Sequence, residues 1–257
     1  MLIFQIINII RVISIIKIFL KKMGPTISLN KAHNSYKSDS KQFPKNISKS
    51  QKKETLFILD WDDTLMCTSF VSSKTQSLSE EDKNIIINLG KIVSIFLKEC
   101  LKYGKIIIMT NSSERWMKKT AQNYLKIKND IFENIKIIST RDRYYKKGIE
   151  VTKWKEMASE EILLKYGDKI ENLICGSDSE NDIEVFKNIS KKYININIST
   201  IKFKTKPSPS IMIKEIEYLN KRLYEIIGTN KNYYLIIEKP KKDNYNFSYG
   251  YLLDYIF

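Results

Sequence analysis

Residues 56–65 read Leu-Phe-Ile-Leu-Asp-Trp-Asp-Asp-Thr-Leu, an apolar run of strand length that ends in carboxylates and a hydroxyl. In an open α/β sheet, ligands bind at the carboxyl ends of the strands. Alternation along an extended backbone places Asp60 and Asp62 on the same side, with Trp61 pointing away. Two such carboxylates can act as nucleophile and as general acid and base, and together they favour a hard divalent cation. A simpler interpretation is that Asp and Thr only cap the next helix.

Further apolar runs end in polar residues of the same kind. The run at 105–109 is followed by Thr110 and Asn111, and the run at 135–139 by a polar stretch. The run at 172–175 is followed by Gly-Ser-Asp-Ser-Glu-Asn-Asp at 176–182. Helical patterns alternate with them at 82–103, 113–127, 154–166 and 181–192, with a fifth strand at 194–204 and a last helix at 211–227. This alternation predicts an α/β fold, a Rossmann-like parallel sheet flanked by helices. The reactive side chains would then meet at one edge of the sheet, which disfavours the capping interpretation.

The order of these motifs resembles the haloacid dehalogenase (HAD) superfamily of phosphatases and phosphotransferases, over about residues 56–203. The matching positions are Asp60-Trp61-Asp62-Asp63-Thr64 for the first motif, Thr110 for the second, a lysine at a helix start for the third, and Asp178 with Asp182 for the fourth. The residue sequence of these motifs is also similar to that of poorly characterised HAD-like proteins of protists and plants. One departure is that Ser177 separates Gly176 from Asp178, where the family usually has Gly-Asp directly. We expect a local adjustment of the loop that keeps the metal site.

The resemblance implies a role for each residue. Asp60 would attack phosphorus and form an aspartyl-phosphate, and Asp62 would act as general acid and then general base. Mg²⁺ would be held by Asp60, the backbone carbonyl of Asp62 and Asp178. Asp182 would bind it through water or orient a ligand. The hydroxyl of Thr110 and its neighbour Asn111 would bind the phosphoryl group.

The catalytic lysine is either Lys153 or Lys155, which flank Trp154. The resemblance favours Lys155, and each could also be an ordinary solvated lysine. Asp63 and Thr64 are expected to support the turn after the strand, and Thr64 is also a candidate for holding the acid/base carboxylate. The three tryptophans, Trp61, Trp116 and Trp154, are expected to be packing residues.

Composition excludes several other chemistries. The single histidine, His33, lies in a polar stretch, so histidine-based catalysis is not expected. The three cysteines, Cys67, Cys100 and Cys175, have no paired spacing and fit a reduced compartment. Cys175 is expected in the core, and Cys67 lies near the motif without a sign of a lowered pKa. No zinc pattern, P-loop or Gly-rich dinucleotide signature is present.

The positive charge is concentrated in residues 1–53, which carry a net +10 of the total +15. The remaining 204 residues carry +5, so we expect no nucleic-acid partner. Residues 1–22 are apolar and could form a signal anchor, although Arg11 adds about 2.5–3.5 kcal/mol to insertion. Alternatives are N-myristoylation of Gly24 if translation begins at Met23, or a tail with no anchor. Residues 23–53 resemble a flexible basic linker, and the protein is expected in the cytoplasm, with possible tethering to the cytosolic face of a membrane.

Residues 54–230 are predicted to form the catalytic domain, and the tyrosine-rich residues 231–257 a short hairpin or packed tail. The segments between the motifs are too short for a cap domain, so the HAD core is predicted to be capless. A basic loop at 141–147 is expected near the open site. The predicted function is a Mg²⁺-dependent phosphomonoester hydrolase acting on a phosphoprotein or a lipid phosphate. The alternative is an inactive HAD-like pseudophosphatase that binds a phosphorylated partner.

Overall fold

The computed structural model describes residues 54–74, 77–228, 231–237 and 251–252. These residues belong to one compact unit, Lys49–Phe257. Six parallel strands form a sheet in the order β3-β2-β1-β4-β5-β6, and β7 continues it antiparallel to β6. The strands are β1 (Glu54–Leu59), β2 (Gly104–Thr110), β3 (Ile135–Ser139), β4 (Ile170–Ser177), β5 (Asn197–Lys202), β6 (Tyr233–Ile236) and β7 (Tyr251–Leu252).

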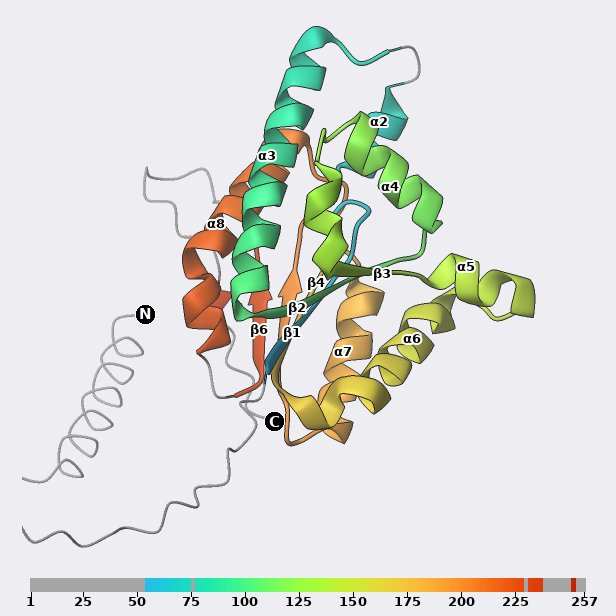
Figure 1. Cartoon of the computed structure of the whole chain (residues 1–257), viewed down its shortest axis with the longest axis vertical. Coiled ribbons are helices and arrows are strands. Elements are labelled where there is room, and N and C mark those ends of the chain that lie inside the picture. The colour runs from blue at the N-terminus through green and yellow to red at the C-terminus, as the bar shows by residue number, and fades with distance from the viewer. Residues whose placement is uncertain (1–53, 75–76, 229–230, 238–250, 253–257) are drawn as a thin grey trace, which may run out of the picture. The chain divides into compact units, whose positions relative to one another are not determined.

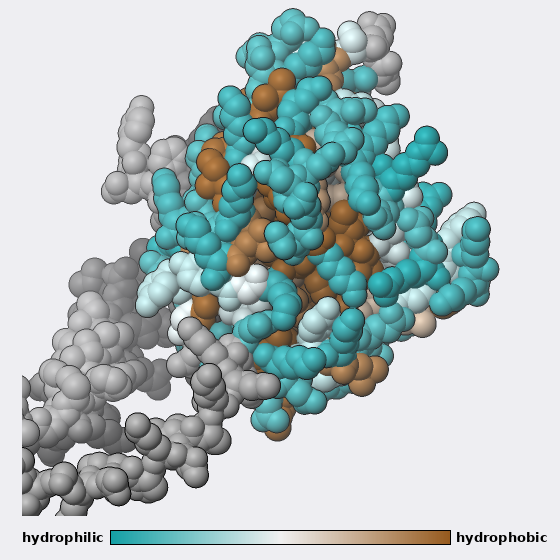
Figure 2. Space-filling model, in the orientation of Figure 1, coloured by the Kyte–Doolittle hydropathy of each residue, from teal (hydrophilic) through white to brown (hydrophobic). Residues whose placement is uncertain are grey.

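Helices cover both faces of the sheet (Figure 1). One face packs against α3, α4 and α8, and the other against α5, α6 and α7. The α-helices are α2 (Thr68–Ser73), α3 (Glu80–Tyr103), α4 (Glu114–Asn123), α5 (Thr140–Tyr144), α6 (Val151–Tyr166), α7 (Glu180–Lys192) and α8 (Pro209–Ile227), and the 3₁₀ helices are η1 (Asn129–Asn134), η2 (Tyr145–Lys147) and η3 (Gly167–Lys169). Burial on both faces explains why the central strands read as continuous apolar runs. On the face seen in Figure 2, hydrophilic residues predominate and apolar residues are visible between them.

The predicted class, a parallel α/β sheet flanked by helices, is confirmed. Only α2 and α3 lie among the described residues between β1 and β2, and only α4 and η1 lie between β2 and β3. Neither connection contains a cap domain in the described part of the chain. Figure 1 shows α2 and α4 near the end of β1.

Several boundaries differ from the sequence predictions. The helix predicted at 113–127 ends at Asn123, and a 3₁₀ helix, η1, follows it. The segment expected to be a basic loop at 141–147 is helical, because Ser139 caps α5 by accepting the Asp142 N–H and η2 follows directly. The helix predicted at 211–227 begins two residues earlier, since Ser208 caps α8 and Pro209 occupies its first turn.

The sheet continues past residue 230, the predicted end of the catalytic domain, because β6 pairs with β5 in parallel. The predicted anchor at 1–22, the predicted linker at 23–53 and residues 238–250 lie outside the described residues. Among the helices of the described ranges, none is long and apolar enough to cross a bilayer.

Candidate active site

A tight turn follows β1 and presents the acidic motif at the edge of the sheet. The carbonyl of Trp61 accepts the N–H groups of Leu65 and Met66, each at 2.9 Å. Asp63 has a positive φ of 54°, a left-handed conformation that Asp adopts more readily than most residues. Its carboxylate accepts the backbone N–H of Ser69 at 2.8 Å and also the Ser69 hydroxyl. The predicted supporting role of Asp63 in this turn is confirmed.

A buried polar cluster forms where β1, β4, α6 and α7 meet. The Lys155 Nζ lies 2.9 Å from Asp60 Oδ2 and 2.5 Å from Asp182 Oδ2. The Ser177 hydroxyl donates to Asp182 Oδ2 at 2.6 Å and lies 3.4 Å from Asp60 Oδ2. Each of these four residues is less than 9% exposed. Three elements distant in sequence from β1, namely α6, β4 and α7, thus bring a lysine, a serine and a second carboxylate to Asp60.

Burial controls the electrostatics of this cluster. It raises the pKa of Asp60 to about 7, with Lys155 acting in the opposite direction and Asp182 adding to the rise. Burial by itself lowers the pKa of Lys155, but Asp60 and Asp182 outweigh it, so the net shift is upward and Lys155 stays protonated. Burial also raises the pKa of Asp178 to about 6, and the nearby charge of Asp63 adds to this effect. In both aspartates, burial is the main cause of the raised pKa, and Lys155 acts against it.

The fourth motif is attached to the first through Thr64. The hydroxyl oxygen of Thr64 accepts the backbone N–H of Asp178 at 3.0 Å. The expectation that Thr64 holds the acid/base carboxylate is therefore wrong, and its hydroxyl instead positions the loop after β4. No loop adjustment is seen at Ser177, because β4 continues through this residue, which pairs with Lys202 of β5 and lies in the buried cluster, and Asp178 follows directly after the strand.

Asp62 has a separate set of partners. Its Oδ1 accepts the Thr68 hydroxyl at 2.6 Å and the Trp116 indole N–H at 3.2 Å, and its Oδ2 accepts the Thr110 hydroxyl at 2.9 Å. Thr110 also accepts the Ser112 N–H at 2.9 Å. The interpretation of Trp116 as only a packing residue is wrong, because its ring nitrogen bonds the acid/base candidate. A tryptophan in the first turn of the helix after the second motif was the only sequence signal for this contact.

The remaining predicted residues lie around this centre. Asn111 is exposed, and its Oδ1 accepts the Thr140 hydroxyl at 2.6 Å. Lys153 is exposed and pairs with Glu156 at 3.1 Å, so it does not enter the cluster that contains Lys155. Cys67 is buried, and burial raises the pKa of its thiol to about 12, which leaves it unreactive.

The fit of a divalent cation rests on the chemistry of the donors. Within the described ranges, no three His, Cys, Asp or Glu side chains converge as a metal-binding group. However, Asp60 at the end of β1 and Asp178 directly after β4 supply hard carboxylate oxygens at the ends of two paired strands. Mg²⁺ prefers such carboxylates and keeps several waters, so it needs few protein ligands. The residues present therefore fit this ion.

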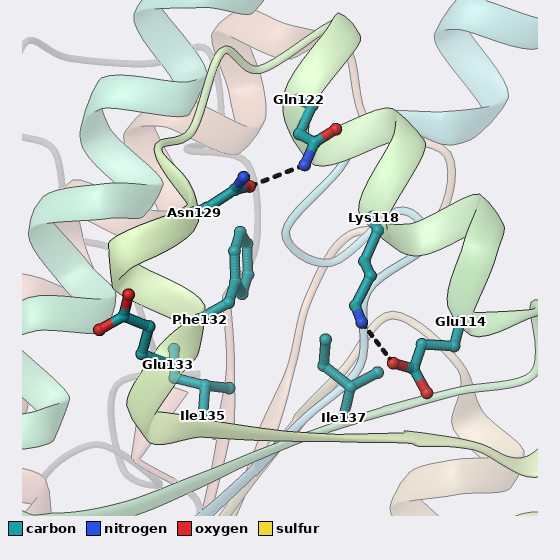
Figure 3. Close-up of a pocket in the computed structure, with 8 residues that line it drawn as sticks. All are labelled: Glu114, Lys118, Gln122, Asn129, Phe132, Glu133, Ile135 and Ile137. Carbon is teal, nitrogen blue, oxygen red and sulfur yellow. Dashed lines mark hydrogen bonds and ion pairs between the residues drawn. The ribbon is translucent and has the colours of Figure 1, made fainter.

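One hollow of about 400 Å³ lies away from the carboxylates, beside the edge strand β3 (Figure 3). It is lined by residues of α4, η1 and β3, namely Glu114, Lys118, Gln122, Asn129, Phe132, Glu133, Ile135 and Ile137. An ion pair between Glu114 and Lys118 and a hydrogen bond between Gln122 and Asn129 flank it. None of the predicted site residues lines this hollow.

The parallel sheet, whose described connections contain no cap domain, and the acidic motifs at its carboxyl edge are those of a HAD-like phosphatase. More specifically, the family model described as NLI interacting factor-like phosphatase matches residues 55–238, which is more than half of the chain. The chain therefore belongs to this family of phosphatases. A comparison with curated proteins finds no match. Among solved structures, the chain is similar to the crystal structure of the Legionella pneumophila effector Ceg4, with 13% identity and a TM-score of 0.46, covering 72% of this chain and 99% of that one.

Proposed function

We propose that this protein is a Mg²⁺-dependent phosphomonoester hydrolase that works through an aspartyl-phosphate on Asp60. The observation that carries this proposal is the buried Asp60 beside Lys155, with Asp62 two residues away and held by hydrogen bonds of its own. A nucleophilic carboxylate splits one difficult displacement into two easier ones. Membership in a phosphatase family supports the same reaction class.

In the first step, an Asp60 oxygen would form a bond to phosphorus while the ester P–O bond breaks. Asp62 would give its proton to the departing oxygen. In the second step, water would attack the phosphorus of the aspartyl-phosphate and lose a proton to Asp62. Asp60 would then leave as a carboxylate, and inorganic phosphate would be released.

Positive charge would be supplied by Lys155 and by the metal. The exposed position of Lys153 favours Lys155 as the catalytic lysine, because only Lys155 reaches Asp60. When bound, Mg²⁺ supplies charge stabilisation for the phosphoryl oxygens. Asp60, Asp178 and the backbone carbonyl of Asp62 would hold it. Asp182 would orient the metal site indirectly. It is hydrogen-bonded to Lys155 and Ser177, which lie beside Asp60.

The phosphoryl group would be bound by the Thr110 hydroxyl and by Asn111. Thr110 donates to Asp62 in this structure, so it would exchange that partner for a phosphoryl oxygen when substrate binds. Asn111 is exposed and joined to Thr140, the first residue of α5. The hydrogen bond between Asn111 and Thr140 supports a phosphate site beside the basic segment formed by α5 and η2.

The proposed substrate is a phosphoprotein. Without a cap, the site must be closed by the substrate itself, which favours a macromolecule. The exposed Arg141, Lys146 and Lys147 of α5 and η2 would attract the acidic chain around a phosphorylated residue. Arg141 stacks on the exposed Tyr145 at 5.6 Å, so an aromatic surface accompanies this charge.

The test is hydrolysis of an aryl phosphate by the purified protein with and without Mg²⁺. Asp60→Asn should abolish turnover and Asp62→Asn should reduce it severely. Full activity of Asp60→Asn would overturn the mechanism, and a wild type without Mg²⁺-dependent turnover would favour a pseudophosphatase. Substrate class is then tested by comparing phosphopeptides, phosphoinositides and small metabolite phosphates at equal concentration. Much faster hydrolysis of one small metabolite would contradict the proposed class.

A further inference from the structure

The carboxylate of Asp62 is held by side chains from three different elements. The donors are Thr68 in the first turn of α2, Thr110 at the end of β2 and Trp116 in the first turn of α4. Thr110 has a place in the proposed phosphate site, whereas Thr68 and Trp116 have no role in the chemistry described so far. Both of them bond the same oxygen, Oδ1.

A second indole bond joins the same two parts of the molecule in the opposite direction. Trp61, between the two catalytic aspartates, is fully buried, and its ring nitrogen donates to the Thr120 hydroxyl at 2.9 Å. Thr120 lies four residues after Trp116, on the same face of α4. The loop after β1 thus donates to α4 through Trp61, and α4 donates back to this loop through Trp116.

The indole of Trp116 can bond Asp62 in only one way, as a donor. An indole N–H can donate but cannot accept, so Trp116 can hold only an acceptor such as a carboxylate oxygen. A hydroxyl such as that of Thr68 can rotate between partners, and it also lies 3.4 Å from the Met66 carbonyl. Trp116 is anchored by the helix that carries it, and this helix is fixed to the loop by the Trp61 bond.

We propose that Trp116 is a positioning residue that, together with Thr68, orients the Asp62 carboxylate for proton transfer to the leaving oxygen. This inference rests on the proposed function. Proton transfer by a side chain requires hydrogen-bond distance to the reacting atom, and small displacements reduce the rate strongly. Loss of the orienting bond should therefore affect the proton-transfer contribution selectively and leave nucleophilic attack by Asp60 intact.

The test compares leaving groups of different acidity in Trp116→Phe, which keeps an aromatic ring and loses the N–H. 4-Nitrophenyl phosphate releases a stable anion and needs little protonation, whereas a phosphoserine peptide releases an alkoxide and needs a proton. General acid catalysis typically contributes about 10²–10⁴-fold. The hydrolysis of the aspartyl-phosphate is common to both substrates, so the comparison uses kcat/KM, which reports the steps up to departure of the leaving group. We therefore expect kcat/KM for phosphoserine to fall at least about tenfold more than kcat/KM for 4-nitrophenyl phosphate.

The matched control is Trp154→Phe. The Trp154 indole donates to the Ile149 carbonyl at 2.8 Å, so this variant loses a comparable hydrogen bond without touching Asp62. Trp154→Phe should change kcat/KM for the two substrates by the same factor. Thr68→Val should reproduce the selective loss of phosphoserine turnover, and Thr68→Ser, which keeps the hydroxyl, should restore it. Because Thr68 and Trp116 bond the same Oδ1, the Thr68 pair tests the proposed orientation of Asp62 even if Trp116→Phe does not fold.

The outcomes separate the two proposals. If the wild type hydrolyses both substrates and Trp116→Phe or Thr68→Val lowers kcat/KM for both by equal factors, the positioning role is overturned and the phosphatase function stands. If the wild type hydrolyses neither substrate with Mg²⁺, the proposed function fails and the positioning role fails with it.

Discussion

Replacing Lys155 by methionine tests the buried cluster most directly. Methionine keeps the length and packing of the side chain and removes the charge that lies 2.9 Å from Asp60 and 2.5 Å from Asp182. Removing one partner of a buried ion pair typically destabilises a protein by about 3–5 kcal/mol, because the other charge stays buried without compensation. The raised pKa of Asp60 allows it to take up a proton and relieve part of this loss. We therefore expect the lower end, about 3 kcal/mol.

This loss should be visible as a lower melting temperature. For a domain of this size, each kcal/mol corresponds to about 2–4 °C, so Lys155→Met should melt about 6–12 °C below the wild type. Calorimetry and urea titration in the presence of a chelator measure the effect without a bound metal. Turnover of an aryl phosphate should fall about 10²–10³-fold, as for other preorganised charge-stabilising donors.

Lys153→Met is the matched control, with the same substitution two residues away. Its side chain is 61% exposed and pairs with Glu156 at the surface, and such pairs contribute about 0–1 kcal/mol. It should retain nearly full stability and activity. Equal losses in the two variants, or a Lys155→Met protein as stable as the wild type, would refute the buried ion pair and the choice of Lys155.

Three further predictions concern other parts of the chain. Burial raises the pKa of Glu215 to about 7 although it accepts the Lys204 N–H, so its ionisation should lower stability as pH rises from about 4.5 to 7. Glu215→Gln should avoid this loss, up to about 3 kcal/mol at pH 8 and none at pH 4, and urea titrations showing a pH-independent difference would contradict this. Gly90→Ala should destabilise by at least about 1–3 kcal/mol, because its Cβ would lie 1.8 Å from the Leu125 carbonyl oxygen; a melting temperature equal to wild type would argue against this packing. Residues 1–53 are predicted to promote membrane contact, so cell fractionation should find less membrane-bound protein when they are deleted, and equal distributions would disprove the tether.

The sequence alone was sufficient for the class of fold and for the positions of the motifs. Each apolar run, such as 56–59, is buried on both faces, and its polar end residues come from the same stretch of chain. Hydrophobic periodicity and strand ends are local properties, and parallel pairing then brings Asp60, Thr110 and Asp178 to one edge. Helix boundaries were less accurate where capping decides them, as at Ser139, because capping depends on individual hydrogen bonds.

The tertiary structure decided which side chains contact each other within the site. Lys153 and Lys155 lie in the same helical turn and cannot be ranked by composition, but only the face of α6 that carries Lys155 packs toward β1. The partners of Asp62 lie 6, 48 and 54 residues away, and no periodicity encodes such distances. Thr64 and Trp116 were misassigned for the same reason. A hydrogen bond needs a donor and an acceptor within about 3 Å, and this proximity depends on how whole helices pack on the sheet.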